Sequence, residues 1–311
     1  MQDHRFPCTF REKRNRCALE AARGEAINGC GAFLVTSTAN AFCIRAALIG
    51  VQALLVTLFV TIPEAHAAQT APPECPGCIS PTDEIQVYDA EITELGKFNL
   101  TWHNNFTPQG QTVPDFPGGV VPDHAENGVP EWAYGFREWL ELGAYVPIYS
   151  YTNTARLLFE GVKLRTLFVV PHAAERTFFY GLNFEYSYNE STWDTHRFSA
   201  EMRPIIGTHL GPWDLIVNPV LDTEYNGFRN FTFAPETRVA YNFSPKFALA
   251  AEWYGEFGPV SQFLTPAEQG QNLFAVVDIG SSSHGIEFGV GHGFTSGSTR
   301  TIIKLMLMQD F

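Results

Sequence analysis

The sequence predicts an all-β fold, an up-and-down antiparallel transmembrane β-barrel of about twelve strands, and three observations support it. Segments in which every second residue is apolar recur from Phe98 almost to the last residue, and this is the period of a β-strand. The 311 residues include 26 Phe, 11 Tyr and 6 Trp, and strands favour aromatic side chains. The connections between the segments mostly alternate between long and short, as in a meander whose long loops emerge on one side.

Twelve segments have the two-residue period. In residues 177–188, Tyr180 and Tyr186 lie on the apolar face, whereas Asn183 and Glu185 lie on the opposite face. The longer connections follow the odd-numbered strands, and tight turns such as residues 211–212 follow most of the even-numbered ones. The predicted strands are residues 97–106, 131–136, 140–150, 157–170, 177–188, 197–210, 213–222, 232–243, 247–257, 271–281, 284–294 and 299–311.

The number of strands decides which face of the barrel points outward. About eight strands enclose an interior that side chains just fill, and about sixteen leave an aqueous channel. A closed ring of twelve is too wide for an apolar filling, so its interior should be polar and its apolar face should meet lipid. A soluble two-sheet β-sandwich exported to the periplasm is the alternative architecture. It explains the alternation but not the asymmetry of the connections.

Charged residues of both signs lie on the predicted inner face. We assign eight of them to the lumen as candidate selectivity residues: Lys163, Arg165, Glu185, Glu201, Arg203, Glu236, Arg238 and Glu252. Two interpretations stay open. The residues form either an electrostatic constriction that selects solutes, or a network of salt bridges that plugs the barrel and holds it rigid.

The N-terminal part of the chain reads as an export segment, residues 1–67. Residues 46–62 form an apolar run that is short for a membrane span and fits the core of a signal peptide. The sequence Ala65-His66-Ala67 fits a signal-peptidase site, with cleavage before Ala68. Residues 1–44, basic at first and containing four cysteines, are interpreted as an upstream extension from a mis-assigned start.

After cleavage we expect two parts. Residues 68–96 form a periplasmic N-terminal tail, Pro-rich at its start, for which entry into the lumen is an alternative. Residues 97–311 form the barrel, and an even number of strands places both termini on the periplasmic side, with the short turns. Acidic residues outnumber basic ones, 33 to 20 over the whole chain, which argues against a nucleic-acid partner.

Cys75 and Cys78 are the only cysteines that remain after the predicted cleavage. In an oxidising compartment the simplest interpretation is a local disulfide in the tail. A redox pair or half of a metal site are the alternatives. No second pair completes a zinc site, so we expect no metal and no cofactor.

Catalytic residues are not predicted. Ser199 and His209 share a polar face, but ten residues along a strand span about 33 Å, so the two side chains cannot touch. His103, His124 and a luminal carboxylate are a conceivable acid–base or metal set, although isolated histidines are more often polar wall residues. The sequence therefore predicts a protein that is not an enzyme.

The last strand carries a resemblance to a known class. Residues 301–311, TIIKLMLMQDF, place Leu305 and Leu307 on one face and end on Phe311. With the signal and the aromatic strand ends, this resembles a Gram-negative outer-membrane β-barrel. The resemblance implies that Leu305, Leu307 and Phe311 form the signal that the outer-membrane assembly machinery reads. Gln309 departs from the pattern, since an apolar residue is common there.

Residues 129–150, VPEWAYGFREWLELGAYVPIYS, contain a hairpin of the form YG…LELG. It loosely resembles a group of outer-membrane transporters linked to aromatic-compound (phenol meta-pathway) degradation. We therefore expect a narrow channel or transporter component for small solutes, in contact with outer-membrane lipid. A closed structural barrel whose long loops bind partners is the alternative, and a barrel enzyme is the third hypothesis.

Overall fold

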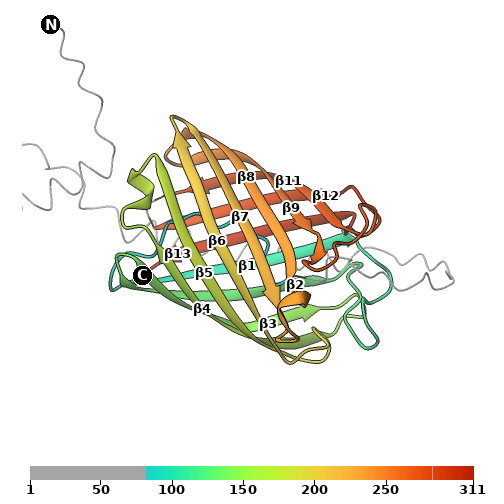
Figure 1. Cartoon of the computed structure of the whole chain (residues 1–311). Helices are drawn as coiled ribbons and strands as arrows, with labels where there is room; N and C mark the ends of the chain where they lie inside the picture. The colour runs from blue at the N-terminus through green and yellow to red at the C-terminus, as the bar shows by residue number, and fades with distance from the viewer. Residues whose placement is uncertain (1–81, 282) are drawn as a thin grey trace, which may run out of the picture. The chain divides into compact units, whose positions relative to one another are not determined.

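The structure is a computed structural model, and it describes residues 82–311 except residue 282. Twelve long antiparallel strands form one barrel, with each strand next to its neighbour in the chain (Figure 1). The two-residue strand β10 (Gly258–Pro259) and the short 3-10 helices η1 (Ala173–Glu175) and η2 (Phe228–Asn230) lie in connections. The long strands are β1 (Phe98–Gln109), β2 (Glu126–Arg137), β3 (Leu140–Tyr151), β4 (Leu157–Val169), β5 (Phe178–Asn189), β6 (Phe198–Leu210), β7 (Trp213–Thr223), β8 (Thr232–Ser244), β9 (Phe247–Glu256), β11 (Gly270–Gly280), β12 (His284–Gly293) and β13 (Thr301–Asp310).

The barrel closes where the last strand meets the first. β13 pairs with β1 from Asn99 opposite Asp310 to Phe106 opposite Ile303, and the Phe311 N–H donates to the Phe98 carbonyl at 2.8 Å. β9 pairs with both β8 and β11, which completes the ring. A closed ring has no free strand edge, so every long strand has a partner on each side. The predicted twelve-strand antiparallel barrel is confirmed.

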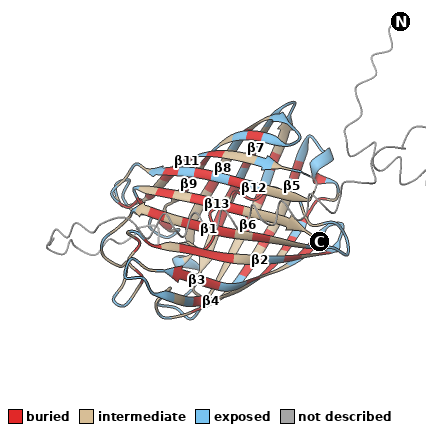
Figure 2. Ribbon diagram, turned by 180° about the vertical axis from the view of Figure 1, so that it is seen from behind, coloured by how far each residue is buried: buried red, intermediate tan, exposed pale blue. Residues whose placement is uncertain are grey.

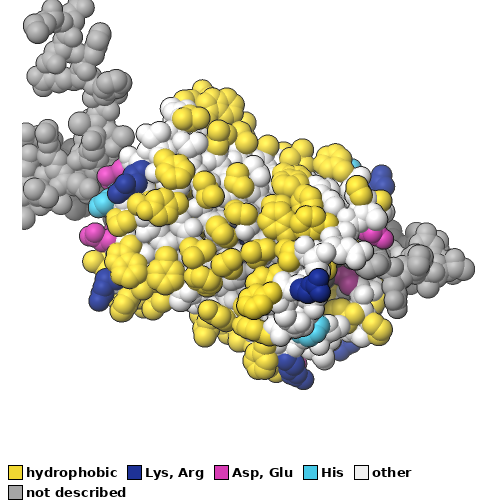
Figure 3. Space-filling model, viewed as in Figure 1, with side chains coloured by type: hydrophobic (Ala, Val, Ile, Leu, Met, Phe, Trp, Pro, Cys, Tyr) yellow, Lys and Arg dark blue, Asp and Glu magenta, His cyan; other side chains and the backbone are white. Residues whose placement is uncertain are grey.

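The two faces of the wall differ as the alternation predicts. Leu164, Tyr180 and Ile206 are among the large apolar side chains exposed on the outside, and apolar side chains cover the wall in Figure 3. Buried and more exposed residues alternate along β1 and β13 (Figure 2). Within the part of the chain that the structure describes, no helix is long and apolar enough to cross a membrane.

The barrel has two different mouths. Five connections lie at one mouth, which we call the short-turn mouth: residues 138–139, 170–177, 211–212, 245–246 and 281–283. The connections at the other, the long-loop mouth, are residues 110–125, 152–156, 190–197, 224–231, 257–269 and 294–300. The predicted alternation therefore holds, with the connection that contains η1 as the one longer segment at the short-turn mouth.

The prediction was wrong about the start of the second strand. β2 begins at Glu126, opposite Phe106 of β1, and not at residue 131. Gly128 and Pro130 interrupt the apolar alternation and resemble loop residues. Pro130 has no N–H to donate to a neighbouring strand. It lies at the irregularity where the β2–β3 register shifts between Gly128 and Glu131, so no ladder hydrogen bond is lost there and the strand continues past it.

Two buried phenylalanines require glycine on the neighbouring strand. Phe179 and Phe274 are each 1% exposed and point into the barrel. A Cβ at Gly207 would lie 2.1 Å from the Phe179 ring, and one at Gly291 would lie 2.4 Å from the Phe274 ring. These glycines therefore make room for the two aromatic side chains on the inner face of the barrel.

Closure of the barrel predicts heat-modifiable migration on gels. Hydrogen bonds in a ring without an edge should survive dodecyl sulfate at room temperature and break on boiling. We expect unboiled and boiled samples to run at clearly different apparent masses. Identical migration of the two samples would contradict the closed barrel.

Candidate functional site

The chain passes through its own barrel before the first strand begins. Residues 82–95, which we call the luminal segment, run from the long-loop mouth to the short-turn mouth. Near the long-loop mouth, Asn105 Nδ2 donates to the carbonyls of Thr82 and Asp83 at 3.0 and 3.1 Å. Near the other mouth, the Thr93 N–H donates to Glu141 Oε2 at 2.5 Å. Most of the described part of the predicted tail therefore lies inside the barrel. Its first described residue, Thr82, lies at the mouth opposite to Phe311, and not on the same side of the barrel as the prediction placed the tail.

Wall side chains hold the backbone of the luminal segment. The Tyr88 N–H donates to Asn218 Oδ1 at 2.7 Å, and Asn218 Nδ2 donates back to the Tyr88 carbonyl at 3.0 Å. Lys304 Nζ donates to the Ile85 carbonyl at 3.2 Å. Because these groups are buried, each bond replaces one that the segment would otherwise make with water.

Two guanidinium groups lie over the Tyr88 ring in the middle of the lumen. Arg203 and Arg165 lie 4.7 and 5.4 Å from its ring centroid. Its hydroxyl bonds to the Tyr145 hydroxyl and lies 3.5 Å from Glu185 Oε1. Cations over an aromatic face attract its electron-rich centre, so this one side chain links the segment to β3, β4, β5 and β6.

Arg203 on β6 contacts both the wall and the segment. Its Nε is 2.6 Å from Glu201, and its Nη1 is 2.8 Å from Glu236. Nη1 also donates to the Gln86 carbonyl at 2.7 Å, and Nη2 lies 3.8 Å from Glu84. A planar fork with five donors suits such shared contacts.

Lys163 on β4 holds the acidic start of the luminal segment. Its Nζ lies 2.9 Å from Asp83 and 3.3 Å from Glu185. Glu185 also accepts a hydrogen bond of 2.9 Å from Asn183 Nδ2. Removal of the segment would leave Lys163 with one carboxylate partner among the residues that are described.

Arg165, two residues further along β4, joins β2 and β3. It pairs with Glu131 at 2.8 Å and with Glu141. His103, fully buried on β1, lies with its Nε2 3.1 Å from Glu131. The lumen face predicted for His103 is observed, and the residue pairs with a wall carboxylate.

A second group of ion pairs fills the opposite side of the lumen. Arg238 pairs with Glu252 and Asp278, and it lies 3.4 Å from Glu287. Lys304 is fully buried and pairs with Glu252 and, at 2.6 Å, with Glu287. The two cations share two carboxylates, so the four side chains act as one unit.

All eight predicted lumen residues lie inside the barrel, and each is in at least one of these ion pairs. The residues are Lys163, Arg165, Glu185, Glu201, Arg203, Glu236, Arg238 and Glu252. Sequence reasoning missed Glu131, Glu141 and the segment's own Tyr88. The signal for the segment was the alternation of residues 84–92, EIQVYDAEI, which lies next to a Pro-rich stretch and was assigned to the tail.

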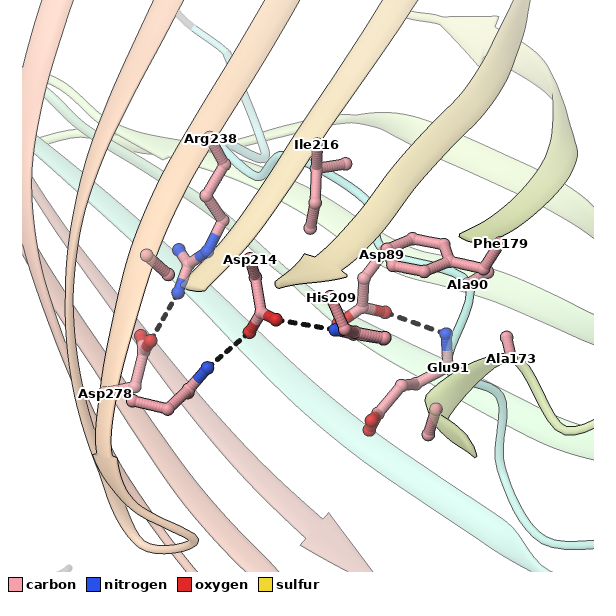
Figure 4. A pocket seen from close by; sticks show the side chains of 13 residues that line it. Asp89, Ala90, Glu91, Ala173, Phe179, His209, Asp214, Ile216, Arg238 and Asp278 are labelled. Carbon is pink, nitrogen blue, oxygen red and sulfur yellow. Dashed lines mark hydrogen bonds and ion pairs between the residues drawn. The ribbon is translucent and has the colours of Figure 1, made fainter. Parts of the chain in front are cut away.

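A pocket of about 200 Å³, which we call the vestibule, opens at the short-turn mouth (Figure 4). His209 Nδ1 lies 2.5 Å from Asp214 Oδ1, and Asn242 Nδ2 donates to Asp214 Oδ2 at 2.5 Å. The luminal segment contributes Asp89 and Glu91 to the lining, and Arg238 and Asp278 form an ion pair on the opposite wall. The vestibule is therefore mostly acidic.

The long-loop mouth is covered by its own loops. The Val120 N–H in loop 110–125 donates to the Thr192 carbonyl in loop 190–197 at 3.1 Å. Thr192 Oγ1 donates to Glu160 Oε2 at 2.5 Å, and Trp193 packs on the buried cluster that contains Tyr145. A pocket of about 10 Å³ beneath, lined partly by Thr82, has room for about one water molecule.

Three surface residues near the long-loop mouth have the spacing of metal ligands. Ligand atoms of Asp194, His196 and Glu224 lie within 4.8 Å of one another. His196 Nδ1 already lies 2.9 Å from Glu224. The pKa of the Glu224 carboxyl is raised above its ordinary value, because burial and the neighbouring Asp194 outweigh the opposite effect of His196. Exposed side chains that pair with one another in this way make no metal site by themselves.

The separation of Ser199 and His209 agrees with the prediction. Ser199 Oγ accepts a hydrogen bond of 3.0 Å from Asn189, near the long-loop end of β6. His209 pairs with Asp214 near the short-turn end. The two side chains therefore belong to different ends of the lumen and form no catalytic pair.

The remaining predicted positions lie outside the lumen or outside the described residues. Leu305 and Leu307 lie on the face of β13 opposite the buried Lys304, and Phe311 is 63% exposed at the short-turn mouth. The export segment, its apolar run at 46–62, and the predicted disulfide of Cys75 and Cys78 lie outside the described residues.

An antiparallel barrel of twelve long strands, apolar outside and charged inside, defines the class of protein: the outer-membrane type of β-barrel. Within this class, the chain is similar in fold to the COG4313 outer membrane channel from Pseudomonas putida F1. The TM-score is 0.50 at 10% identity, over 73% of this chain and 100% of that one. The KdgM porin in complex with disordered oligogalacturonate has a TM-score of 0.44 at 9% identity, over 68% and 99% of the two chains. The NanC porin has 0.44 at 6%, over 69% and 98%. No family model and no curated protein matches the chain.

Proposed function

We propose that the chain is an outer-membrane channel for small solutes, and that the luminal segment closes it in the state described here. One observation carries the proposal: an extended stretch of polypeptide runs through the lumen from mouth to mouth. A passage that holds a peptide backbone with its side chains is wide enough for a small solute once the peptide moves aside.

The chemistry of the contacts supports a segment that can move aside within the lumen. Polar contacts hold the segment at Asp83, Gln86 and Tyr88, through Lys163, Arg203 and other wall side chains. Water can replace such contacts at small net cost, because a hydrogen bond made on folding exchanges for one with water. Apolar contacts of residues 85–90 with the wall add to the hold.

The similarity in fold to an outer membrane channel supports the same location for this chain. In the proposed orientation the short-turn mouth and Phe311 face the periplasm, and the long loops face outward. Outer-membrane lipid surrounds the apolar wall. Leu305, Leu307 and Phe311 are proposed as the signal for the assembly machinery. The eight predicted lumen residues are proposed to control which solutes pass.

Conductance in planar lipid bilayers tests the channel directly. We expect the purified mature chain to show discrete single-channel openings. Arg238→Ala should change their size, because Arg238 lies in the lumen beside three carboxylates. The matched control is Arg137→Ala at the short-turn end of β2, where the side chain is exposed and lies over the Phe136 ring. Silence of every variant at all voltages would overturn the proposal.

A closed structural barrel is the second candidate, and the covered long-loop mouth favours it. The hydrogen bond from Val120 to Thr192 joins two loops that are not neighbours around the ring. In this case the loops 110–125 and 257–269 would bind partners outside, and no variant of the lumen would conduct.

A further inference from the structure

Carboxylates outnumber basic groups among the ion pairs that fill the lumen. Each basic side chain contacts at least two carboxylates. The five basic residues are Lys163, Arg165, Arg203, Arg238 and Lys304. The ten carboxylates are Asp83, Glu84, Glu131, Glu141, Glu185, Glu201, Glu236, Glu252, Asp278 and Glu287. His103 also lies in the lumen and pairs with Glu131.

The sign of this imbalance does not depend on the position of the luminal segment. The segment contributes Asp83 and Glu84, and the strands contribute the other eight carboxylates. With the segment displaced, five basic groups would still face eight wall carboxylates. Carboxylates would therefore still outnumber basic groups in the open state.

Five carboxylates have a buried oxygen without a hydrogen-bond partner among the described residues: Asp83, Glu84, Glu160, Asp278 and Glu287. The oxygens of Asp83 and Glu287 lie in ion pairs with Lys163 and Lys304, so Glu84 and Glu160 are the clearest cases. The Glu84 side chain is 4% exposed and both of its oxygens lack one, and its ion pair with Arg203 is 3.8 Å long. Glu160 is fully buried, and its Oε1 lacks a partner while Oε2 accepts from Thr192. Buried carboxylate oxygens in this condition favour a positively charged ligand, which would compensate them.

The vestibule continues the excess of carboxylates toward the short-turn mouth. Asp89, Glu91, Asp214 and Asp278 line it, against the single guanidinium of Arg238 (Figure 4). Because Arg238 already pairs with Asp278, a positively charged solute would find carboxylates at the entrance as well as in the middle of the lumen.

From these contacts we infer that the lumen selects small inorganic or organic cations over anions. An anion in the passage would meet basic groups that carboxylates already surround, whereas a cation would meet carboxylates in excess. Carboxylates that line a pore select cations in this way. The inference deepens the proposed channel function and rests on it for transport, although the charge preference of the lumen can be measured separately.

The reversal potential in a tenfold gradient of KCl measures the selectivity. We expect cations to be at least threefold more permeant than chloride, and Glu201→Gln with Glu236→Gln to lower that ratio. Glu138→Gln, an exposed carboxylate in the turn 138–139, is the matched control and should leave the ratio unchanged. A ratio of one or less in the unmodified protein would overturn the inference.

Cysteine modification tests the charge preference without any need for conduction. Ala174 is exposed and lines the vestibule, so Ala174→Cys, with the six native cysteines replaced by serine, offers one thiol there. We expect the ratio of reaction rates with positively and negatively charged methanethiosulfonates to be at least threefold higher than for Thr154→Cys in loop 152–156. An equal ratio would overturn the inference. If the bilayers show no conductance but the thiols react at the expected rates, the proposed channel function would be overturned and the charge preference of the lumen would stand.

Discussion

Tyr88→Ala is expected to raise the open probability of the channel at least tenfold in planar bilayers. The ring makes cation–π contacts with Arg165 and Arg203, and its hydroxyl bonds to Tyr145. Two cation–π contacts and one hydrogen bond are together worth about 2 kcal/mol or more. About 1.4 kcal/mol changes an equilibrium tenfold, so loss of these contacts should shift the segment toward its displaced state.

Two further variants of the luminal segment sharpen this result. Tyr88→Phe keeps the ring and loses the hydroxyl, so its open probability should lie between those of the unmodified protein and Tyr88→Ala. Glu91→Ala is the control, because Glu91 belongs to the same strand-like run but its side chain is exposed in the vestibule. An open probability that is the same in all four proteins would mean that the segment is a fixed part of the wall.

Lys304→Met is expected to lower the free energy of unfolding by about 3 kcal/mol. Lys304 is fully buried and pairs with Glu252 and Glu287. Removal of one partner from a buried ion pair leaves an uncompensated charge, which costs about 3–5 kcal/mol. Arg238 contacts the same two carboxylates, so we expect the lower end of this range. Urea unfolding in detergent micelles or lipid vesicles measures it.

The control for this variant is a lysine outside the lumen. The Lys97 side chain is 53% exposed and pairs with Glu94 at 3.3 Å. An exposed pair contributes about 0–1 kcal/mol, so Lys97→Met should change the stability little. If Lys304→Met is as stable as Lys97→Met, the luminal pairs do not hold the barrel together. Glu252→Gln added to Lys304→Met should recover part of the loss, because it removes one uncompensated charge.

Most of the wall could be predicted because lipid and lumen impose opposite demands on alternate residues. Where the alternation is clean, as in residues 178–189, the predicted strand differs from the observed one by a residue at each end. Where Gly128 and Pro130 occupy positions in the pattern, the prediction placed the strand start five residues late. A glycine and a proline carry no information about the side of the wall, so the sequence alone could not correct this.

The lumen could be predicted as a set of residues but not as a network. Alternation places Glu252 and Lys304 on the inner face, but it does not say that they meet, because β9 and β13 are separated by β11 and β12 around the ring. Contacts across a lumen depend on the registers of all strands between the two residues. The luminal segment was harder still, since its partners come from strands all around the barrel.

The luminal segment also constrains the order of events in folding. Thr82 lies at the long-loop mouth, and Gly96, where the chain reverses with a φ of 78°, lies at the other. If β1 and β13 had already paired, the segment could reach this position only by passing end-first through the closed ring of strands. Threading of that kind is almost absent from proteins. We therefore expect the seam between β1 and β13 to close around a segment that is already in place.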